Sequence, residues 1–147
     1  MIARIRKSMD EKDQGFTLVE LLVVMIIIGI LAAIAIPVFL NQRRKAAETA
    51  AKADVSTIGK EIAAYYVDGT LALTITSASQ VWTMKDSAAV SITTGKLSGK
   101  NTAAGTAAAD GQTFCVAVDP SATIDKAKVW HYNQDGLASG ACPVAAP

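Results

Sequence analysis

The 147-residue sequence has few of the residues that most catalytic and metal sites require. It contains one histidine and two cysteines, so a zinc site with several protein ligands or a Ser-His-Asp triad has little to draw on. Aromatic residues make up only 5%, and 14 Lys and Arg nearly balance 13 Asp and Glu, for a net charge of +1. That balance lacks the basic excess typical of nucleic-acid-binding domains. We therefore expect a protein that is not an enzyme and holds no metal or cofactor, and nothing in the charge supports DNA as a partner.

Hydrophobic residues, by contrast, make up 51% of the chain and gather near its N-terminus. Residues 16–40 form an apolar run with a single charged residue, Glu20. As a helix with a rise of about 1.5 Å per residue, this run would be about 37 Å long, enough to cross a hydrocarbon core of about 30 Å. A buried helix of a soluble core is the alternative, but a domain of this size could hardly surround a helix that is apolar on every face. The run therefore predicts a transmembrane helix.

A cleaved secretory signal is another reading of an apolar run in this position. The run is longer than the usual apolar core of such signals, about 7–15 residues. No small-x-small cleavage site bounded by polar residues follows it, and Glu20 interrupts it close to its start. We therefore expect the helix to be retained. Four basic residues precede it and three follow it, which orients it only weakly.

The residues around Glu20 resemble the signal junction of type IV prepilins and of the related pseudopilins of type II secretion and competence systems. The resemblance rests on Gly15-Phe16-Thr17-Leu18-Val19-Glu20 and on the apolar run that follows, with its glycine and proline. A Gly-Phe step, a carboxylate five residues after the glycine and a proline within the run rarely coincide. The similarity extends over roughly residues 1–45, and the remainder fits the family only in outline.

The resemblance implies that residues 1–15 are a leader peptide. A prepilin peptidase would cut between Gly15 and Phe16 and then methylate the new amine of Phe16. Glycine suits such a site because the backbone can stay extended and accessible directly before a helix. A glycine that merely marks the helix boundary is the alternative, and Phe16 and Glu20 together favour the cleavage site.

Glu20 would then lie four residues from the new chain start. A carboxylate within a bilayer is costly and usually has a partner, although near a helix end it can extend to the interface. In a filament of packed apolar helices, the cation nearest to the Glu20 carboxylate would be the N-terminal amine of Phe16 in a neighbouring subunit. The family implies that pairing during assembly.

Gly29 and Pro37 are expected to weaken the helix between them. Proline removes one helical hydrogen bond, and glycine is a poor helix former, so we expect a kink. An ordinary kinked transmembrane helix is the alternative. The resemblance implies more, namely that this segment can lose helical structure in an assembled filament.

The helical pattern continues over 41–67 with a different character. An apolar stripe appears at helical spacing, comprising Val55, Ile58, Ile62, Tyr65 and Tyr66. Glu48 and Lys52 stand four residues apart in the order that favours an ion pair on an exposed face. We therefore predict one helix of about 50 residues, apolar in its first half and amphipathic in its second, that stops near Gly69.

A covering layer for the stripe is expected from the C-terminal half. Segments that favour β-structure are 71–76, 80–84, 90–94, 113–118 and 128–132. Residues 95–111 are small and polar and are predicted to be a flexible loop, whereas 133–136 are predicted to be a turn. His131 alternates with two aromatic residues and is expected on the solvent face. The prediction is an α+β fold, a long helix packed on a small antiparallel sheet of unknown strand order, and this matches the outline of type IV pilin headgroups.

Cys115 and Cys142 are the only cysteines and lie 27 positions apart. Two thiols in an exported domain usually pair, and many type IV pilins close a C-terminal loop with a disulfide. Two unrelated buried thiols are the alternative. A disulfide would also place residues 41–147 outside the cytoplasm.

Together these features predict a structural subunit of a type IV pilus that serves adhesion, motility or DNA uptake. It would be stored in the membrane and then polymerise through the helix over 16–40 into a filament of identical subunits on the cell surface. Because the chain has no nucleotide-binding motif, the family implies an assembly ATPase and a platform membrane protein as partners, besides the peptidase. A pseudopilin of a type II secretion or competence apparatus, or a non-polymerising membrane-anchored binding module, is the alternative.

Overall fold

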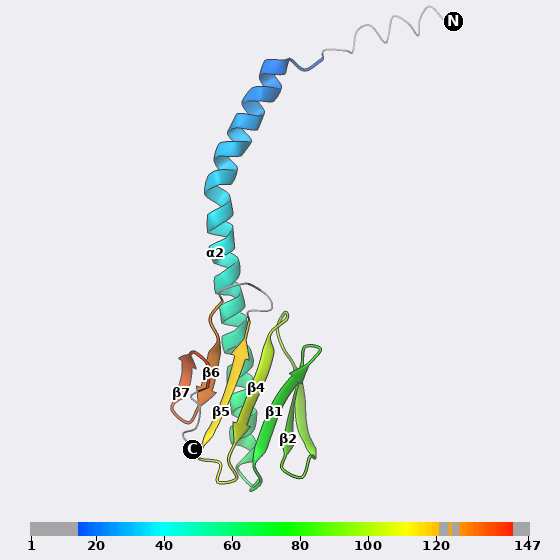
Figure 1. Ribbon diagram of the computed structural model, residues 1–147, viewed down its shortest axis with the longest axis vertical. Coiled ribbons are helices and arrows are strands. Elements are labelled where there is room, and N and C mark those ends of the chain that lie inside the picture. Colours follow the sequence, from blue (N-terminus) through cyan, green and yellow to red (C-terminus); the bar gives the residue numbers. More distant parts are fainter. Residues whose placement is uncertain (1–14, 121–123, 125–126, 143–147) are drawn as a thin grey trace, which may run out of the picture. The chain divides into compact units, whose positions relative to one another are not determined.

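The computed structural model describes residues 15–120, 124 and 127–142. The leader peptide predicted over 1–15 therefore lies outside the described residues, except for Gly15. Among these described residues, one helix is followed by seven strands (Figure 1). The chain divides into two compact units, Met1–Leu40 and Asn41–Pro147.

Helix α2 (Leu18–Tyr65) is continuous over 48 residues, close to the predicted length. It passes through Gly29 and Pro37 without interruption, and the kink expected there stays a prediction. Beyond the last helical residue, the Gly69 backbone N–H donates to the Tyr65 carbonyl at 2.8 Å. Gly69 thus closes the helix, as its position after the apolar stripe predicts.

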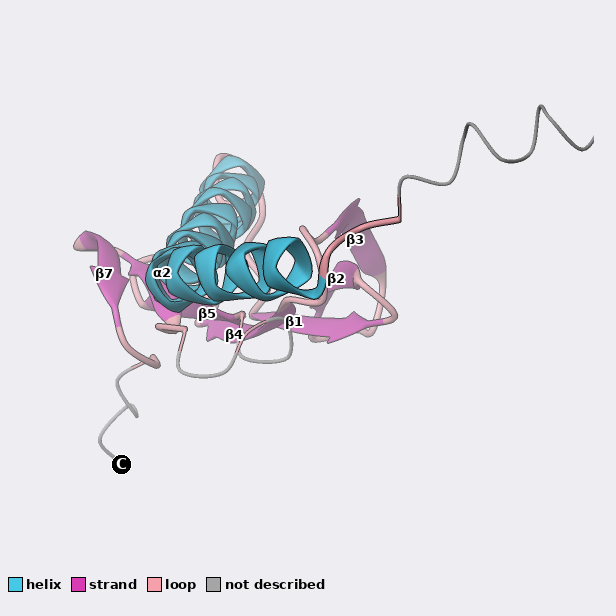
Figure 2. Ribbon diagram, turned by 90° about the horizontal axis from the view of Figure 1, so that it is seen from above, coloured by secondary structure: helices cyan, strands magenta, loops and turns pink. Residues whose placement is uncertain are grey.

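The seven strands form one antiparallel sheet. In chain order they are β1 (Leu73–Ala78), β2 (Val81–Asp86), β3 (Ser91–Lys96), β4 (Thr102–Ala107), β5 (Phe114–Asp119), β6 (Trp130–Asn133) and β7 (Gly136–Ser139). Their spatial order is β3-β2-β1-β4-β5-β6-β7, and Figure 2 shows β7 and β3 at opposite edges. The predicted α+β class is therefore confirmed, and five of the strands lie within one or two residues of the expected segments.

The prediction of a flexible loop over 95–111 is wrong at its centre. Strand β4 occupies Thr102–Ala107 and pairs with β1 on one side and β5 on the other. Its alanine-rich sequence has little β-propensity, but pairing with strands on both sides outweighs that preference. Gly105 is needed here, because an added Cβ would lie 2.6 Å from the Val116 Cα of the neighbouring strand. The short strand β7 was also not expected, since its residues include no β-branched or aromatic side chain.

The core of the second unit forms between α2 and one face of the sheet. The stripe residues Val55, Ile58 and Ile62 are fully buried, as predicted, and they pack against side chains of β1, β2, β4 and β5. Tyr132 of β6 also packs against this cluster. Gly59 makes room for that ring, because a Cβ at this position would overlap it.

Candidate functional site

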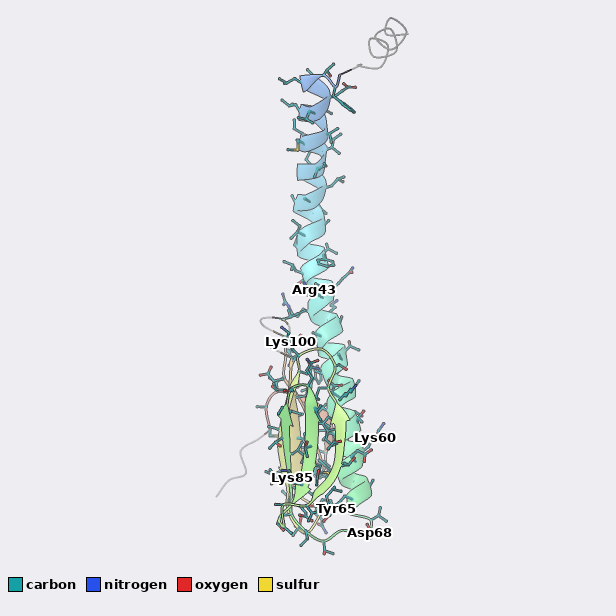
Figure 3. All side chains as sticks on the ribbon, turned by 90° about the vertical axis from the view of Figure 1, so that its right-hand side faces the viewer. Arg43, Lys60, Tyr65, Asp68, Lys85 and Lys100 are labelled. Carbon is teal, nitrogen blue, oxygen red and sulfur yellow. A yellow bond between two sulfur atoms is a disulfide. The ribbon has the colours of Figure 1, made fainter. Side chains whose placement is uncertain are left out.

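The described part of the first unit is an apolar helical surface. The large apolar side chains between Phe16 and Leu40 are 46% to 90% exposed, and side chains project all round the helix there (Figure 3). By length and composition this is one helix that is long and apolar enough to cross a membrane. So large an apolar area normally meets lipid or another protein. The predicted segment 16–40 therefore has the surface expected of a membrane-spanning or polymerising helix.

Thr17 and Glu20 join at the start of this helix through reciprocal hydrogen bonds. The Glu20 carboxylate accepts from the Thr17 backbone N–H at 3.0 Å and from the Thr17 hydroxyl at 2.8 Å. In return, the Glu20 backbone N–H donates to the Thr17 hydroxyl oxygen at 3.2 Å. This is a capping box, which satisfies helix N–H groups that have no partner within the helix. The Thr-x-x-Glu spacing in the sequence carries this signal, but it was not used in the prediction.

The predicted cleavage residues lie just before this cap. The Phe16 side chain is 90% exposed. An added Cβ at Gly15 would meet no atom within 4 Å, so nothing in the described chain itself requires glycine there. If position 15 requires glycine, that requirement comes from a molecule that binds the junction.

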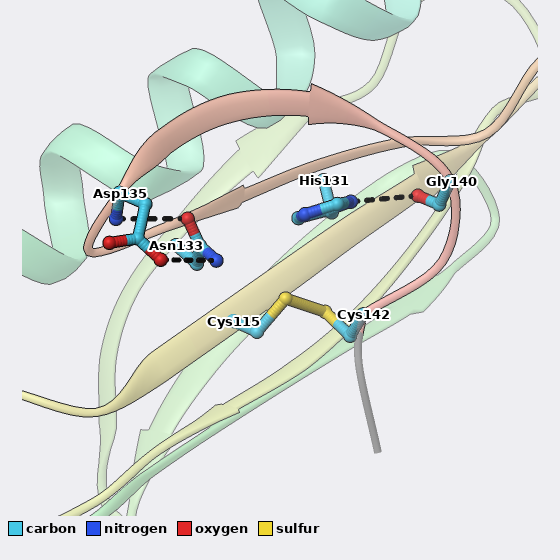
Figure 4. The surroundings of a disulfide bond; sticks show 6 residues. All are labelled: Cys115, His131, Asn133, Asp135, Gly140 and Cys142. Atoms are coloured by element: carbon cyan, nitrogen blue, oxygen red, sulfur yellow. Dashed lines mark hydrogen bonds between the residues drawn. A yellow bond between two sulfur atoms is a disulfide. The ribbon is translucent and has the colours of Figure 1, made fainter. Parts of the chain in front are cut away.

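The two cysteines are joined, as predicted. Cys115 of β5 and Cys142 form a disulfide with a Cα–Cα distance of 5.8 Å (Figure 4). Next to it, the His131 Nδ1 lies 3.0 Å from the Gly140 carbonyl oxygen, and the Gly140 N–H donates to the Val129 carbonyl at 2.8 Å. The disulfide and these contacts fasten residues 140–142 to the outer part of the sheet.

Asp54 on α2 makes a connection that the sequence reasoning missed. Its carboxylate is 9% exposed and accepts hydrogen bonds from the Ser98 backbone N–H at 2.9 Å and hydroxyl at 2.8 Å. It also accepts from the Asn101 side-chain amide at 2.8 Å, and Asn101 is only 3% exposed. Asp54 therefore fixes the connection between β3 and β4 to the helix. The available signal was a carboxylate placed directly beside the apolar stripe.

Glu48 and Lys52 do not lie on an open face of the helix, contrary to the prediction. The Glu48 carboxylate accepts a hydrogen bond from the Lys128 backbone N–H at 3.2 Å. The Lys52 ammonium lies 4.0 Å from the centroid of the Trp130 ring, a cation–π contact. Both side chains are half-buried, because the chain leading into β6 covers this face of α2. Their role is to anchor that segment.

The described residues bring together no set of groups suited to catalysis or metal binding. No three His, Cys, Asp or Glu side chains among them are close enough to hold a metal ion. An open groove of about 700 Å³ beside the disulfide is lined mainly by small side chains of β4 and β5 and has no charged residue. The site that stands out chemically is therefore the apolar helix with its capped carboxylate.

Comparison with known proteins identifies the same segment. A family model for the prokaryotic N-terminal methylation motif matches residues 11–36. The chain is 39% identical over 57 residues to type II secretion system core protein G of Pseudomonas aeruginosa, covering 39% of this chain and 40% of the relative. It is 45% identical over 49 residues to the type IV major pilin protein PilA of Myxococcus xanthus, covering 33% of this chain and 22% of the relative.

A third relative is prepilin peptidase-dependent protein D of Escherichia coli, 59% identical over 39 residues, covering 26% of this chain and 27% of the relative. The chain spans about two fifths or less of the length of these curated relatives. No solved structure matches it. The resemblance drawn from the Gly15–Glu20 junction is thereby confirmed, and it concerns the N-terminal part of the chain.

Proposed function

We propose that this chain is a structural subunit of a type IV pilus. A prepilin peptidase removes residues 1–15 by cutting between Gly15 and Phe16, and the new Phe16 amine is methylated. The subunit is stored in the membrane and then polymerises through the helix over 16–40. The observation that carries the proposal is the exposed apolar surface of this helix, which directly follows a junction matching the prokaryotic N-terminal methylation motif.

The exposed surface supports polymerisation because an apolar helix must be covered either by lipid or by other apolar helices. A filament with these helices packed at its centre covers the surface without a membrane. Residues 41–147 then remain at the periphery as a folded domain. This arrangement accommodates both a helix suited to lipid and a folded domain with a hydrophobic core of its own.

Glu20 supplies the specificity that apolar packing lacks. Apolar contact alone does not fix how far one helix slides along another, whereas a charge pair does. In our proposal, the Glu20 carboxylate pairs with the Phe16 ammonium of a neighbouring subunit inside the filament. Gly29 and Pro37 leave the helix between them open to local unwinding when the filament is stretched.

The Cys115–Cys142 disulfide supports a location outside the cytoplasm for residues 41–147. Disulfides form and persist in oxidising compartments and are rare in the cytosol. We therefore place this domain on the outer side of the membrane before assembly and on the cell surface afterwards. The disulfide thus supports this orientation of the helix, for which the flanking basic residues give only weak support.

The remaining partners follow from what the chain itself does not provide. Extraction of an apolar helix from a membrane requires energy, and the sequence contains no nucleotide-binding motif. An assembly ATPase and a platform membrane protein would supply and transmit that energy. The subunit itself is not an enzyme in this proposal, and it binds no cofactor. The near-neutral charge of the sequence gives no support to DNA as a ligand of the finished filament.

A pseudopilin of a type II secretion or competence apparatus is the second candidate, because one relative is named type II secretion system core protein G. It would share the cleavage, the helix and Glu20. The disulfide near residue 142 resembles the loop of many type IV pilins and favours the pilus. A membrane-anchored binding module that is never cleaved is the third candidate.

Mass spectrometry of the N-terminus separates the cleaved forms from the uncleaved one. Protein from membranes and from the sheared surface fraction is compared, with a Gly15→Val variant as the processing control. The proposal predicts a chain that begins at methylated Phe16 in both wild-type fractions, and only uncleaved chain in the Gly15→Val variant. A wild-type protein that keeps residues 1–15 and is absent from the sheared fraction would refute the proposal.

A further inference from the structure

The sheet of the described residues has two edges whose outer strands pair with no further strand. Among the described residues, β3 and β7 are the outermost strands, at opposite ends of the sheet (Figure 2). Each strand is antiparallel to its neighbours, so the first and the seventh run in the same direction. A second copy displaced sideways in the same orientation therefore brings its β7 edge beside the β3 edge of the first.

The strand registers show which residues would then lie at the same level. One row of paired residues crosses the whole sheet through Lys85, Thr74, Thr106, Cys115, Asn133 and Gly136. Lys85 pairs with Ser91 at the start of β3, and Gly136 directly follows Asp135. The basic residue Lys85 and the acidic residue Asp135 therefore lie at about the same height along the strands, each near one of the two edges of the sheet.

The next row of paired residues passes close to one exposed apolar residue on each edge of the sheet, Ile92 on β3 and Leu137 on β7. This row runs through Met84, Ile75, Gly105, Val116, Tyr132 and Leu137. Met84 pairs with Thr93, and a register shift leaves Ile92 between Thr93 and Ser91. Ile92 is 38% exposed and Leu137 is 43% exposed. Each edge thus offers an apolar side chain next to its charged one.

At the level of the row that contains Lys85, the exposed charged side chains near the two edges are opposite in sign. Lys85 and Lys96 are both exposed on the β2–β3 side (Lys85 in Figure 3). The neighbouring Asp86 is half-buried, and its carboxylate accepts a hydrogen bond from the Val90 N–H at 2.8 Å. On the β7 side, the exposed Asp135 lies in the turn before the strand (Figure 4). Lysine near a sheet edge normally prevents strands from pairing, but it repels a basic edge and attracts an acidic one.

We propose that the β7 edge of one subunit docks on the β3 edge of a second copy, with Leu137 against Ile92 and Asp135 toward Lys85. Because two different edges meet, the contact does not close into a dimer and repeats from copy to copy, as a helical filament requires. The inference rests on the proposed function, which supplies many copies in one orientation along a filament axis. It adds the surface through which the folded domains recognise each other.

Cross-linking of intact filaments tests the contact directly. The chain carries Ile92→Cys together with Leu137→Cys, and the introduced thiols are joined with a short bis-maleimide while the native cysteines stay in their disulfide. We expect a ladder of multimers that needs both substitutions. A control pair, Ile92→Cys with Val67→Cys, has its second thiol on an exposed residue just past the end of α2 and should give no ladder. Normal filaments without a ladder from the first pair would overturn the inference.

Charge reversal tests the same contact without cysteines. Asp135→Lys and Lys85→Asp should each reduce sheared filament by about tenfold, because like charges would face each other across every contact. The two changes together should restore it to within about twofold of wild type. Lys60→Asp, on an exposed face of α2, is the matched control and should leave filament yield unchanged. Formation of the native disulfide serves as the folding check for every variant.

The outcomes separate the two proposals. Single reversals without effect, or a double reversal that fails to restore filament, would overturn the edge contact and leave the pilus subunit intact. Wild-type chain that is never cleaved and never appears in the sheared fraction would overturn both.

Discussion

The Glu20 carboxylate accepts two hydrogen bonds from Thr17, three residues before it, at 3.0 Å from the backbone N–H and 2.8 Å from the hydroxyl. The group that we propose to bind a neighbouring subunit therefore already has partners within its own chain. Cleavage after Gly15 would place the new Phe16 ammonium one residue away from Thr17. In our proposal, the carboxylate exchanges the cap within its own subunit for the charge of the next, so that it has a partner both before and after assembly.

Replacing Thr17 with valine, which has the same shape, should loosen the start of α2. The change removes the hydroxyl that donates to Glu20 and accepts from its backbone N–H. Loss of such a cap should speed hydrogen exchange at the first helical amides by about fivefold in detergent-solubilised full chain. Thr17→Ser keeps the hydroxyl and is the control. Equal exchange in the Val and Ser variants would show that the capping box does not hold in solution.

Replacing Cys115 with serine should destabilise the domain formed by residues 41–147. By the chain-entropy estimate, a disulfide closing a loop of this length contributes about 3.5 kcal/mol. We expect the denaturation midpoint to fall, with insertion of the apolar helix into membranes unchanged. Alkylation gives an independent check, because the thiols of native protein should react only after reduction. Reaction of both cysteines without reductant would contradict the bond.

Replacing Asp54 with asparagine should release the β3–β4 connection. The Asp54 carboxylate accepts three hydrogen bonds, whereas an amide offers a single acceptor oxygen and leaves donors of Ser98 or Asn101 without a partner. We expect a loss of about 2 kcal/mol in the free energy of unfolding. Limited proteolysis should also become faster at residues 98–101. Asp68→Asn, at an exposed position just past α2, is the control, and a loss of the same size there would show that the effect is not specific to Asp54.

Tyr66 should make the domain sensitive to alkaline pH. Burial raises the pKa of its phenol above the ordinary value of 10.0, with smaller contributions from Tyr65 and Asp110. Its hydroxyl lies 2.7 Å from the Ala108 carbonyl oxygen and 3.1 Å from that of Leu71, and only the protonated form can donate to them. The native state therefore holds this proton more tightly than the unfolded chain, so stability is complete below pH 10 and falls as pH rises through the raised pKa.

A Tyr66→Phe variant tests this pH dependence. It should be less stable than wild type near neutral pH, because the hydrogen bond is gone. Above pH 10 the difference between the two proteins should shrink, as wild type loses the same bond by ionisation. Denaturation curves at pH 8 to 11.5 measure it, and a constant difference across that range would argue against the assignment.

The parts of the molecule that could be predicted are those set by local pattern. The apolar run over 16–40 and the stripe through Val55, Ile58 and Ile62 repeat over many residues, so helix α2 was predictable nearly from end to end. Strand β4 was not, because its alanines gain their strand conformation from pairing with β1 and β5. The same holds for Asp54, whose partners lie 44 and 47 residues away along the chain.

At the candidate site, the sequence indicated the chemistry but not all of the geometry. The junction at Gly15 and Phe16 and the carboxylate of Glu20 stood out through their resemblance to the prepilin signal junction, and cleavage and pairing at these residues stay predictions. A lone carboxylate in an apolar run predicts a partner from another subunit, whereas the structure gives Glu20 a partner three residues away in its own chain. The Thr-x-x-Glu spacing of Thr17 and Glu20 indicates a capping box, but it lies at the start of a segment whose most prominent feature is its hydrophobicity.

The most direct test of the proposed assembly mechanism uses a Glu20→Leu variant. It compares the amount of sheared filament with the amount of processed subunit that stays in the membrane. Leucine makes the helix more apolar and leaves Gly15 and Phe16 unchanged, so insertion and cleavage should proceed. Glu61→Leu, an exposed carboxylate later on the same helix, is the control.

The account predicts that Glu20→Leu subunits beginning at Phe16 accumulate in the membrane, with sheared filament reduced by at least about tenfold. The Glu61→Leu variant should assemble like wild type. Abundant filament from processed Glu20→Leu subunits would contradict the claim that this carboxylate pairs subunits during assembly.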